Sequence, residues 1–306
     1  MFLDIKMSEL DKSYHHIPVL LKASVDELVI DPNGIYIDVT YGGGGHSAEI
    51  LNRLSEKGKL VAFDKDPKVA EHLPADKRFE WIYSDFRYLK KYMDYFEIKQ
   101  VDGILADLGL SSHHLDESNR GFSIFSDKPF DMRMNTRQVL TANHILKNYS
   151  ESQLESMIKN YGELTNARLI AKQLVLARKK LNFNSCKEVA IWVSGFAYGN
   201  KVKFLAQFFQ AFRIEVNREI ESLKNLLEQA SSIIKPGGQM VVISYHSLED
   251  RLVKHWFRSG NDEEGTYSNH EVPFKPKYKH AILPDEQEIK MNSRSRSAKM
   301  RVGIKN

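Results

Sequence analysis

The sequence has little cysteine and no long apolar run. Cys186 is the only cysteine among the 306 residues, which excludes a disulfide within the chain and a cysteine-rich zinc site. No apolar stretch reaches the ~18 residues that a membrane span needs, and the N-terminal residues lack the apolar region of a secretory signal. We therefore expect a cytoplasmic protein without a membrane anchor.

A strong excess of one charge is also absent, because 44 Lys and Arg residues are balanced by 40 Asp and Glu residues, giving a net charge of +4. Basic and aromatic side chains nevertheless occur together in four segments: Arg87–Tyr92, Arg251–Arg258, Lys275–Lys279 and Arg294–Arg301. Lys and Arg bind phosphates, and aromatic rings stack on unpaired bases. One such segment alone is more often a solvated helix face, but four together favour a nucleic-acid partner.

Short apolar runs alternate with helical patterns over the first third of the chain. The apolar runs predict strands at 34–39, 59–63, 79–83 and 101–106. Helical patterns lie before and between them, at 15–30, 46–57 and 67–73. This alternation is typical of an α/β fold with a parallel, doubly wound sheet.

The alternation stops after Leu110. Residues 111–135 are polar and loop-like, and 136–200 hold only helical patterns, with capping-box sequences at Ser150–Gln153 and Ser185–Glu188. Beyond them the sequence predicts one long helix at 208–234, a strand at 240–244, a helix at 247–258 and a last strand at 299–304. We therefore predict a core formed by 1–110 and 206–306, interrupted by an all-helical insert at 111–205.

Four consecutive glycines, Gly42–Gly45, follow the first predicted strand. Glycine allows a ligand to approach the backbone, and a helix that begins after such a turn offers N–H groups to an anion. A nucleotide P-loop would need Gly-Lys-Ser/Thr where this chain has Gly45-His-Ser47, and a dinucleotide fingerprint would need a third glycine at Ser47. S-adenosylmethionine is a third class of ligand that uses such a turn, and its amino-acid end requires no pyrophosphate cradle.

Acidic residues end the next three predicted strands. Asp64 lies 22 residues after Gly42, where an acid accepts the ribose hydroxyls of a nucleotide-like cofactor. Asp85 and Phe86 follow the third strand, where adenine contacts are usual, and Asp107 ends the fourth. Each aspartate alone could be a turn or capping residue, but the three acids and the glycine turn together favour a cofactor site.

These motifs, with others along nearly the whole chain, resemble those of the bacterial ribosomal RNA small-subunit methyltransferase H family, also called MraW. The matching stretches are His16–Leu21, Tyr36–Ser47, Phe63–Pro67, Asp102–Ser112, Arg120–Ser123, Asp131–Met134, Phe209–Asn217, Ile243–Arg251 and Arg296–Arg301. The resemblance implies a class I S-adenosylmethionine-dependent (Rossmann-like) methyltransferase core with a helical insert. It also implies N4-methylation of a cytidine in the decoding region of small-subunit ribosomal RNA. From the break in the alternation we predict that the insert helps to recognise RNA.

The resemblance also implies site residues and partners. The cofactor contacts would be Gly44, Gly45, His46, Asp64, Phe86, Asp107 and His114; at the last position family members often carry Gln. The partner would be small-subunit ribosomal RNA or the assembled small subunit, and the protein itself a monomer or a homodimer.

The cytosine amine is a poor nucleophile, so the enzyme must supply acceptors for its N–H groups and align it with the methyl group. Many amino-methyltransferases use an Asp/Asn-Pro-Pro-aromatic loop here, which this chain replaces by Asp107-Leu-Gly-Leu-Ser-Ser112. The candidate acceptors are Asp107, the backbone carbonyls of 108–110, Ser111, Ser112 and Asp131, although Asp131 could instead pair with Arg133. His246 could face the substrate or be structural. No metal is expected, since the cofactor supplies the leaving group.

Two other functions stay open on the sequence alone. An NAD-dependent oxidoreductase would use the glycine turn for a nicotinamide cofactor, and an RNA-binding assembly factor would keep the pocket without catalysis. Methylation at cytosine C5 would need a thiolate nucleophile. Cys186 lies within the second capping box of the insert, where a packing role is the more common one, so we expect N4 as the methylated atom.

Overall fold

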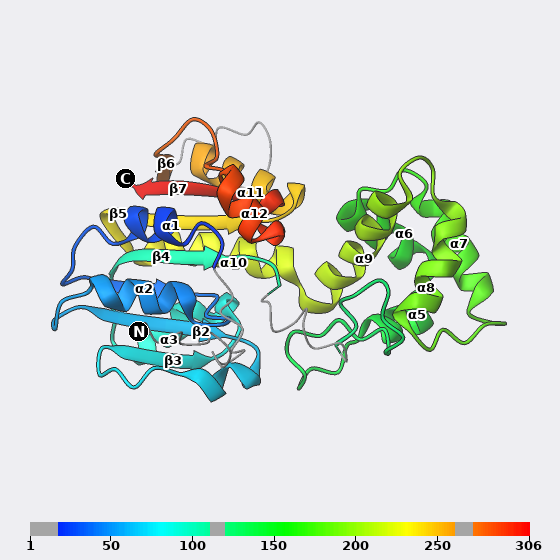
Figure 1. The fold of residues 1–306 in the computed structure, drawn as a ribbon, viewed down its shortest axis with the longest axis horizontal. Coiled ribbons are helices and arrows are strands. Elements are labelled where there is room, and N and C mark those ends of the chain that lie inside the picture. The colour runs from blue at the N-terminus through cyan, green and yellow to red at the C-terminus, as the bar shows by residue number, and fades with distance from the viewer. Residues whose placement is uncertain (1–17, 111–119, 261–271) are drawn as a thin grey trace, which may run out of the picture.

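The computed structural model describes residues 18–110, 120–260 and 272–306, and Figure 1 shows two bodies side by side. One is a β-sheet covered by helices, built from the two ends of the chain. The other is a group of helices from the middle of the chain. No helix among the described residues has both the length and the apolar character that crossing a membrane requires.

The sheet has seven strands in the order β3-β2-β1-β4-β5-β7-β6. They are β1 (Ile35–Asp38), β2 (Lys59–Asp64), β3 (Phe79–Tyr83), β4 (Val101–Asp107), β5 (Ile234–Ser244), β6 (Phe274–Pro276) and β7 (Lys299–Lys305). β1 to β5 pair in parallel, whereas β7 is antiparallel to β5 and to β6. The predicted doubly wound α/β sheet is thus confirmed, with a topological switch point between β1 and β4.

Helices cover both faces of the sheet. The core elements are α1 (Leu21–Leu28), α2 (Gly45–Arg53), η1 (Pro67–His72), η2 (Phe86–Tyr88), α3 (Leu89–Tyr95), α10 (Glu219–Ile233), α11 (Ser247–Ser259), α12 (Glu286–Met291) and η5 (Ser293–Ser297). Successive strand residues point to opposite faces, so Ile104 packs in the cluster of α3, α10 and α11, and Leu105 in that of α1 and α2. Two apolar cores therefore fix the sheet between its helical layers.

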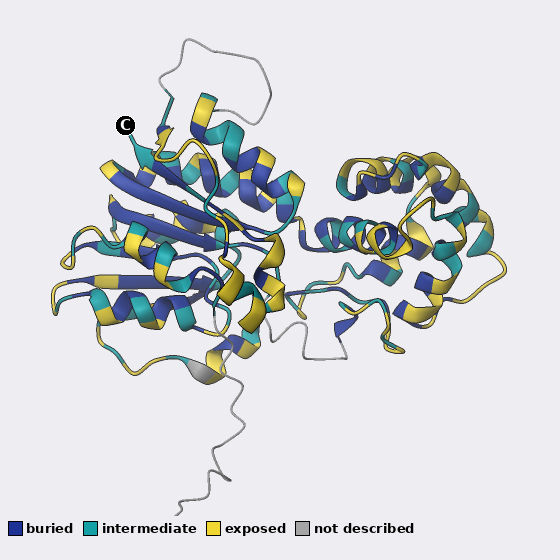
Figure 2. Cartoon of the chain, turned by 45° about the horizontal axis from the view of Figure 1, so that its top comes forward, coloured by how far each residue is buried: buried dark blue, intermediate teal, exposed yellow. Residues whose placement is uncertain are grey.

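The helical group has its own apolar core. Its elements are α5 (Ala142–Asn148), α6 (Glu151–Gly162), α7 (Ala167–Ala177), α8 (Cys186–Val193), η4 (Ser194–Phe196) and α9 (Lys201–Asn217). Their inner faces are buried and their outer faces exposed, as Figure 2 shows, around fully buried Phe208 and Phe212. The core reaches Val216, so the packing supports an insert that ends near Asn217 rather than at 205. The division into domains stays a prediction.

The two predicted capping boxes have different outcomes. At α6 the box is confirmed, because Ser150 Oγ accepts the Gln153 N–H and the Gln153 side chain accepts the Ser150 N–H. At α8 Ser185 Oγ accepts the Glu188 N–H, but Glu188 binds the N–H of Asn184 instead of that of Ser185. The second box is therefore only half formed.

The single long helix predicted at 208–234 is wrong. The chain forms α9 and α10, separated at Arg218, which adopts a left-handed conformation with φ of 50°. The reason lies in the neighbouring Asn217, whose side chain accepts the Met134 N–H and donates to the Met132 carbonyl, both at 2.8 Å. β5 also begins earlier than predicted, at Ile234.

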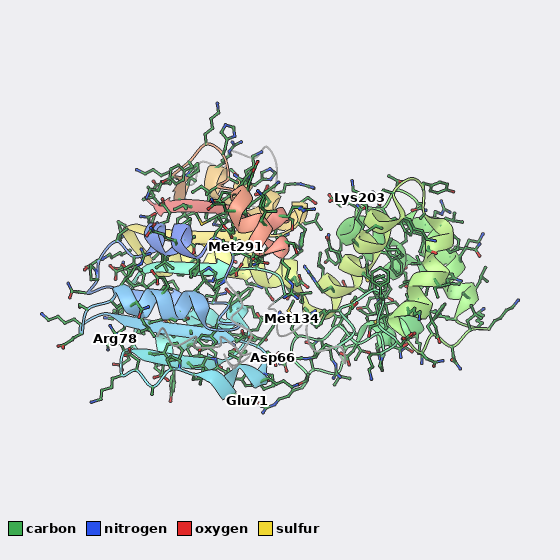
Figure 3. The ribbon with its side chains drawn as sticks, in the orientation of Figure 1. Asp66, Glu71, Arg78, Met134, Lys203 and Met291 are labelled. Carbon is green, nitrogen blue, oxygen red and sulfur yellow. The ribbon has the colours of Figure 1, made fainter. Side chains whose placement is uncertain are left out.

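Long-range polar contacts join the helical group to the sheet. A buried ion pair connects Asp66, after β2, to Arg120, and Arg120 Nη1 donates to the Met134 carbonyl at 3.1 Å. Asp66 and Met134 accordingly lie between the two bodies in Figure 3. Glu163, at the end of α6, accepts a hydrogen bond from Arg251 of α11 at 2.7 Å. The two bodies are thus held at two separate points.

Candidate active site

A cavity of about 600 Å³ lies along the carboxyl ends of β1 to β5, the edge where open α/β sheets bind ligands. Every parallel strand contributes to its lining. The lining includes residues of the glycine turn, the segments after β2, β3, β4 and β5, and four side chains from elsewhere: Met134, Arg213, Glu219 and Arg294. Such a volume is typical of a site for a small molecule.

The glycines of the turn have different roles. Gly44 has φ of +77°, and a Cβ there would lie 2.6 Å from the Tyr41 hydroxyl oxygen, so its backbone conformation requires glycine. Gly43 lines the cavity, and its added Cβ would meet no atom within 4 Å. The turn therefore leaves open space above Gly43, whereas Gly44 lies next to the cavity without lining it.

Asp64 organises this turn from the end of β2. Its Oδ2 accepts the N–H of Gly42 and its Oδ1 accepts the N–H of Asp66, both at 2.8 Å. It also lines the cavity, together with Lys65. Asp64 thus shapes the glycine turn in addition to presenting a carboxylate to the cavity.

The next acid along the sheet edge is Asp85, after β3. Its carboxylate caps η2 and pairs with Arg87 at 3.0 Å and Lys65 at 3.8 Å. Burial alone would raise the pKa of this carboxyl, but Lys65 and Arg87 outweigh burial and hold the pKa below its usual value. Asp85 is therefore a charged residue of the wall, with Phe86 beside it.

Asp107 lies at the centre of the cavity edge, at the end of β4. Its Oδ1 accepts a hydrogen bond from the Tyr245 hydroxyl at 2.7 Å, and its Oδ2 lies 3.7 Å from His46 Nδ1. Burial raises the pKa of Asp107 to about 6, although His46 and Tyr245 act in the opposite direction. The carboxylate is therefore charged at neutral pH but gains its proton under mildly acidic conditions.

Behind Asp107 lies a second buried acid, Asp38, at the end of β1. It accepts hydrogen bonds from Ser47 Oγ at 2.7 Å and from the Thr40 N–H at 3.0 Å. Thr40 Oγ1 in turn accepts the N–H of Asp107 at 2.7 Å. Burial raises the pKa of Asp38 to about 6. Ser47, where a dinucleotide fold would have glycine, is thus a structural partner of this acid.

Charged residues that the sequence interpretation missed line the β5 end of the cavity. Arg213 of α9 donates to both carboxylate oxygens of Glu219 of α10, at 2.9 and 2.8 Å. Glu249 of α11 accepts the Tyr245 N–H at 3.0 Å, and its other oxygen lies 3.2 Å from His246 Nε2. The sequence feature that could have identified Arg213 as a site residue is its position, as an arginine, inside the apolar helical run FFQAFRIEV.

Glu219, His246 and Glu249 bring potential metal ligands within 4.8 Å of one another. Arg213 already binds both carboxylate oxygens of Glu219, which places a positive charge where a cation would have to bind. His246 Nδ1 accepts the Glu249 N–H and caps α11. This cluster is therefore organised by its own hydrogen bonds.

The structure brings together most of the residues proposed from the sequence. Gly45, His46, Asp64, Phe86 and Asp107 line the cavity. Ser111, Ser112 and His114 lie outside the described residues, so their predicted roles stay predictions.

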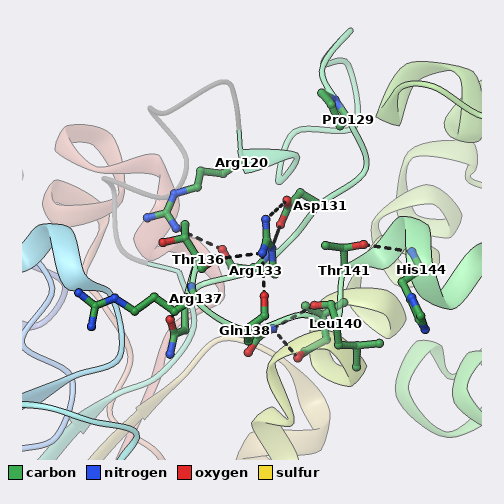
Figure 4. Close-up of polar contacts among 12 residues, drawn as sticks. Arg120, Pro129, Asp131, Arg133, Thr136, Arg137, Gln138, Leu140, Thr141 and His144 are labelled. Atoms are coloured by element: carbon green, nitrogen blue, oxygen red, sulfur yellow. Dashed lines mark hydrogen bonds and ion pairs between the residues drawn. The ribbon is translucent and has the colours of Figure 1, made fainter.

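Asp131 does not line the cavity. Arg133 binds both of its carboxylate oxygens, at 2.8 and 2.7 Å, and also donates to the carbonyls of Thr136 and Gln138, as Figure 4 shows. The alternative role considered for Asp131, pairing with Arg133, is the one that its contacts display, and we do not place Asp131 among the acceptors below.

The chain is similar to known proteins over nearly its whole length. The family model of the MraW methylase family matches residues 13–306. The chain is 47% identical over 302 residues to the ribosomal RNA small subunit methyltransferase H of Bacteroides thetaiotaomicron, covering 97% of this chain and 99% of that protein. It is 48% identical over 296 residues to the protein of the same name from Christiangramia forsetii, covering 95% and 98%. A crystal structure of an rRNA methylase from Streptococcus thermophilus aligns over 95% of this chain and 98% of that chain, with 12% identity and a TM-score of 0.44. This chain belongs to the MraW methylase family.

Proposed function

We propose that this protein transfers the methyl group of S-adenosylmethionine to N4 of a cytidine in the decoding region of small-subunit ribosomal RNA. Family membership makes the protein an S-adenosylmethionine-dependent methyltransferase with a class I core. Its relatives are named as ribosomal RNA methyltransferases, which supports ribosomal RNA as the substrate. The observation that carries the proposal is the cavity itself, in which the glycine turn and the Asp107–Tyr245 pair lie on one sheet edge.

The strand order supports a direction for the cofactor along this edge. Asp64 ends β2, the glycine turn follows β1, Asp107 ends β4 and Tyr245 follows β5, in that spatial order. Three strand spacings separate β2 from β5, about 14 Å in all. We place the adenosine between Asp64 and Phe86, and the methionine end over Gly43. A Cβ at Gly43 would project into this space, so the cradle fits the cofactor.

The cofactor, when bound, supplies an electrophilic methyl group. The protein must then hold the cytosine amine in line with that group and accept its N–H hydrogens. Asp107 is the described carboxylate that lies between the glycine turn and β5, and it is ionised above a pKa of about 6. We propose it as the acceptor of an N4 hydrogen bond, with Ser111 as a further candidate. The helical group would then hold the RNA around the target base.

The test is methyl transfer to small ribosomal subunits that lack the modification, with naked ribosomal RNA as a parallel substrate. We expect N4-methylcytidine when the RNA is digested and its nucleosides are separated by mass spectrometry. A 5-methylcytidine product would overturn the assignment of the atom. RNA binding without any transfer would favour an assembly factor. Thermal protection by nicotinamide cofactors, without protection by S-adenosylmethionine, would favour the oxidoreductase.

A further inference from the structure

The β5 end of the cavity carries charged side chains that neither the cofactor nor the methyl acceptor requires. Arg213 and Glu219 come from α9 and α10, and both line the cavity. The proposed adenosine contacts lie at β2 and β3, with β1 and β4 between them and β5. Ligand atoms of Glu219, His246 and Glu249 lie within 4.8 Å of one another, and the last two residues follow β5. The Arg213–Glu219 pair therefore lies at the β5 end of the cavity, where we place the target base.

The break between α9 and α10 brings these two side chains together. In a continuous helix, residues six positions apart point in directions about 120° apart around the axis and lie about 9 Å apart along it, so they do not meet. Here the left-handed Arg218 turns the chain, and Arg213 Nε and Nη2 reach Glu219 Oε1 and Oε2 at 2.9 and 2.8 Å. Asn217 Nδ2 donates to the Arg213 carbonyl at 2.9 Å and fixes the backbone as well.

This geometry leaves Arg213 with a donor to spare. Only 16% of the Arg213 side chain and 7% of the Glu219 side chain are exposed, so the paired guanidinium has little freedom to move. Nη1 carries two further N–H groups, and within the residues that the structure describes it has no hydrogen-bond partner. A fixed donor that lines a cavity favours a ligand with an acceptor at the matching place.

Cytosine offers such acceptors on its pairing edge, at N3 and O2, next to the N4 amine that donates. Uracil carries an N–H at position 3 and an acceptor at position 4. A donor fixed opposite N3 therefore forms a hydrogen bond with cytosine and meets another donor in uracil. An acceptor such as Asp107 on the N4 side discriminates in the same direction. Enzymes that modify bases commonly identify the extruded base through this edge.

We propose that Arg213, held in place by Glu219, donates through Nη1 to the N3 and O2 edge of the target base and makes the site specific for cytosine over uracil. The proposal rests on the proposed function and adds the residue that identifies the base. Arg213 is thereby a specificity-determining residue that acts in binding, while Glu219 is a positioning residue.

The test compares binding to small ribosomal subunits that carry either cytidine or uridine at the target position, in the presence of S-adenosylhomocysteine. For the full-length wild-type chain we expect tighter binding of the cytidine subunit, by about tenfold to a hundredfold. In Arg213→Met we expect this ratio to fall, mainly through weaker binding of the cytidine subunit, and to keep only the part of the preference that Asp107 supplies. Arg213→Lys keeps the charge but loses the fixed fork, so it should restore only part of the ratio.

Two further variants keep the result interpretable. Glu219→Gln leaves Arg213 in place but loosens it, so the ratio should fall while the melting temperature reports any loss of folding. Arg258→Met is the matched control, because Arg258 is exposed in the last turn of α11 and lies outside the turn that pairs Arg213 with Glu219. Loss of this surface charge should weaken binding of both subunits equally and leave the ratio unchanged.

The outcomes separate this proposal from the proposed function. If wild-type protein forms N4-methylcytidine but Arg213→Met keeps the full preference for cytidine, the role of Arg213 is wrong and the function stands. If Arg213→Met, Arg213→Lys and Glu219→Gln weaken binding of the cytidine and the uridine subunit equally, Arg213 has only a structural role. If wild-type protein forms no N4-methylcytidine, the proposed function itself fails, whatever the variants show.

Discussion

The hydroxyl of Tyr245 donates a hydrogen bond to Asp107 Oδ1 at 2.7 Å, where β5 and β4 end next to each other in the sheet. This bond joins the segment after β5 to the acid after β4. It also opposes the effect of burial, which raises the pKa of Asp107 to about 6. The protonation state of Asp107 therefore depends on Tyr245.

Methyl transfer should fall below pH 6, because protonated Asp107 loses acceptor capacity. Tyr245→Phe removes the bond that stabilises the carboxylate, so the pKa of Asp107 should rise and the acidic limb should move to higher pH. A hydrogen bond to a charged group contributes about 1.5–3 kcal/mol, which corresponds to a rise of about one to two pKa units, so kcat/KM at pH 7.5 should drop by up to about sixfold. The measurement is kcat/KM from pH 5 to 9. Tyr278→Phe, which removes a surface hydrogen bond to Glu27, is the control. If the acidic limb of the pH profile stays in place or moves to lower pH in Tyr245→Phe, the proposed effect of Tyr245 on Asp107 is wrong.

Substitutions at Gly43 and Gly44 should affect different properties of the protein, the first its affinity for S-adenosylmethionine and the second its melting temperature. Gly43→Ala adds a methyl group that meets no protein atom within 4 Å, so we expect an unchanged melting temperature and weaker binding of S-adenosylmethionine. Gly44→Ala combines a positive φ with a contact to the Tyr41 ring, so its melting temperature should fall. Calorimetry and thermal unfolding measure the two effects. Unchanged affinity in Gly43→Ala would remove the methionine end of the cofactor from this turn.

The free energy of unfolding of Asp38→Asn, compared with that of the wild type, should increase as the pH rises. The folded protein holds the Asp38 proton up to about pH 6, whereas an unfolded chain releases it near pH 3.9. Between these values the folded state binds more protons, so its free energy of unfolding falls as pH increases. Asparagine has no such dependence, and the difference between variant and wild type should grow by about 2–3 kcal/mol between pH 4.5 and 7.5.

Urea unfolding at both pH values measures this difference. Asp127→Asn serves as the control, because 77% of the Asp127 side chain is exposed and its variant should follow the wild type within about 0.5 kcal/mol. A difference that stays constant or shrinks with rising pH would show that the pKa of Asp38 is not raised.

Asn217→Ala should destabilise the junction between the sheet and the helical group. Its side chain makes hydrogen bonds with Met134, Met132 and Arg213, and removing it leaves the buried Met134 N–H unpaired. We expect a loss of about 3 kcal/mol in the free energy of unfolding. Since Met134 lines the cavity, methyl transfer should fall as well. Asn225→Ala, which loses one exposed hydrogen bond within α10, is the control and should change the free energy of unfolding by at most about 0.5 kcal/mol. Equal effects of the two substitutions would contradict the role of Asn217 at the junction.

Cys186→Ser should keep methyl transfer within about twofold of wild type. The thiol is fully buried in the core of the helical group, 3.3 Å from the Gly121 carbonyl, and burial raises its pKa to about 11. At pH 8 about one thiol in a thousand is ionised, so alkylation of the native protein should be slow. Iodoacetamide labelling before and after unfolding measures this. Loss of transfer in the serine variant together with a 5-methylcytidine product would indicate the thiolate route.

The sequence by itself determined the local features of this protein. The central parallel strands β1, β2 and β4 are largely buried, so each appears as an apolar run that can be recognised without knowledge of its neighbours. The glycine turn and the acid at Asp64 follow from strand ends and spacing, and Ser150 caps its helix through residues three positions away. The carboxyl ends of parallel strands share one edge, which is why residues far apart in the sequence could be predicted to line one cavity.

Only the tertiary structure decided the break between α9 and α10 and the residues at the β5 end of the cavity. The apolar helical pattern continues through Asn217, but two of its side-chain bonds reach residues 83 and 85 positions away, and no local pattern contains them. The same turn pairs Arg213 with Glu219, and the strand order places Tyr245 beside Asp107 although 138 positions separate them. Contacts of this kind depend on how the chain packs, because hydrogen bonds between distant segments override the local preference to continue a helix.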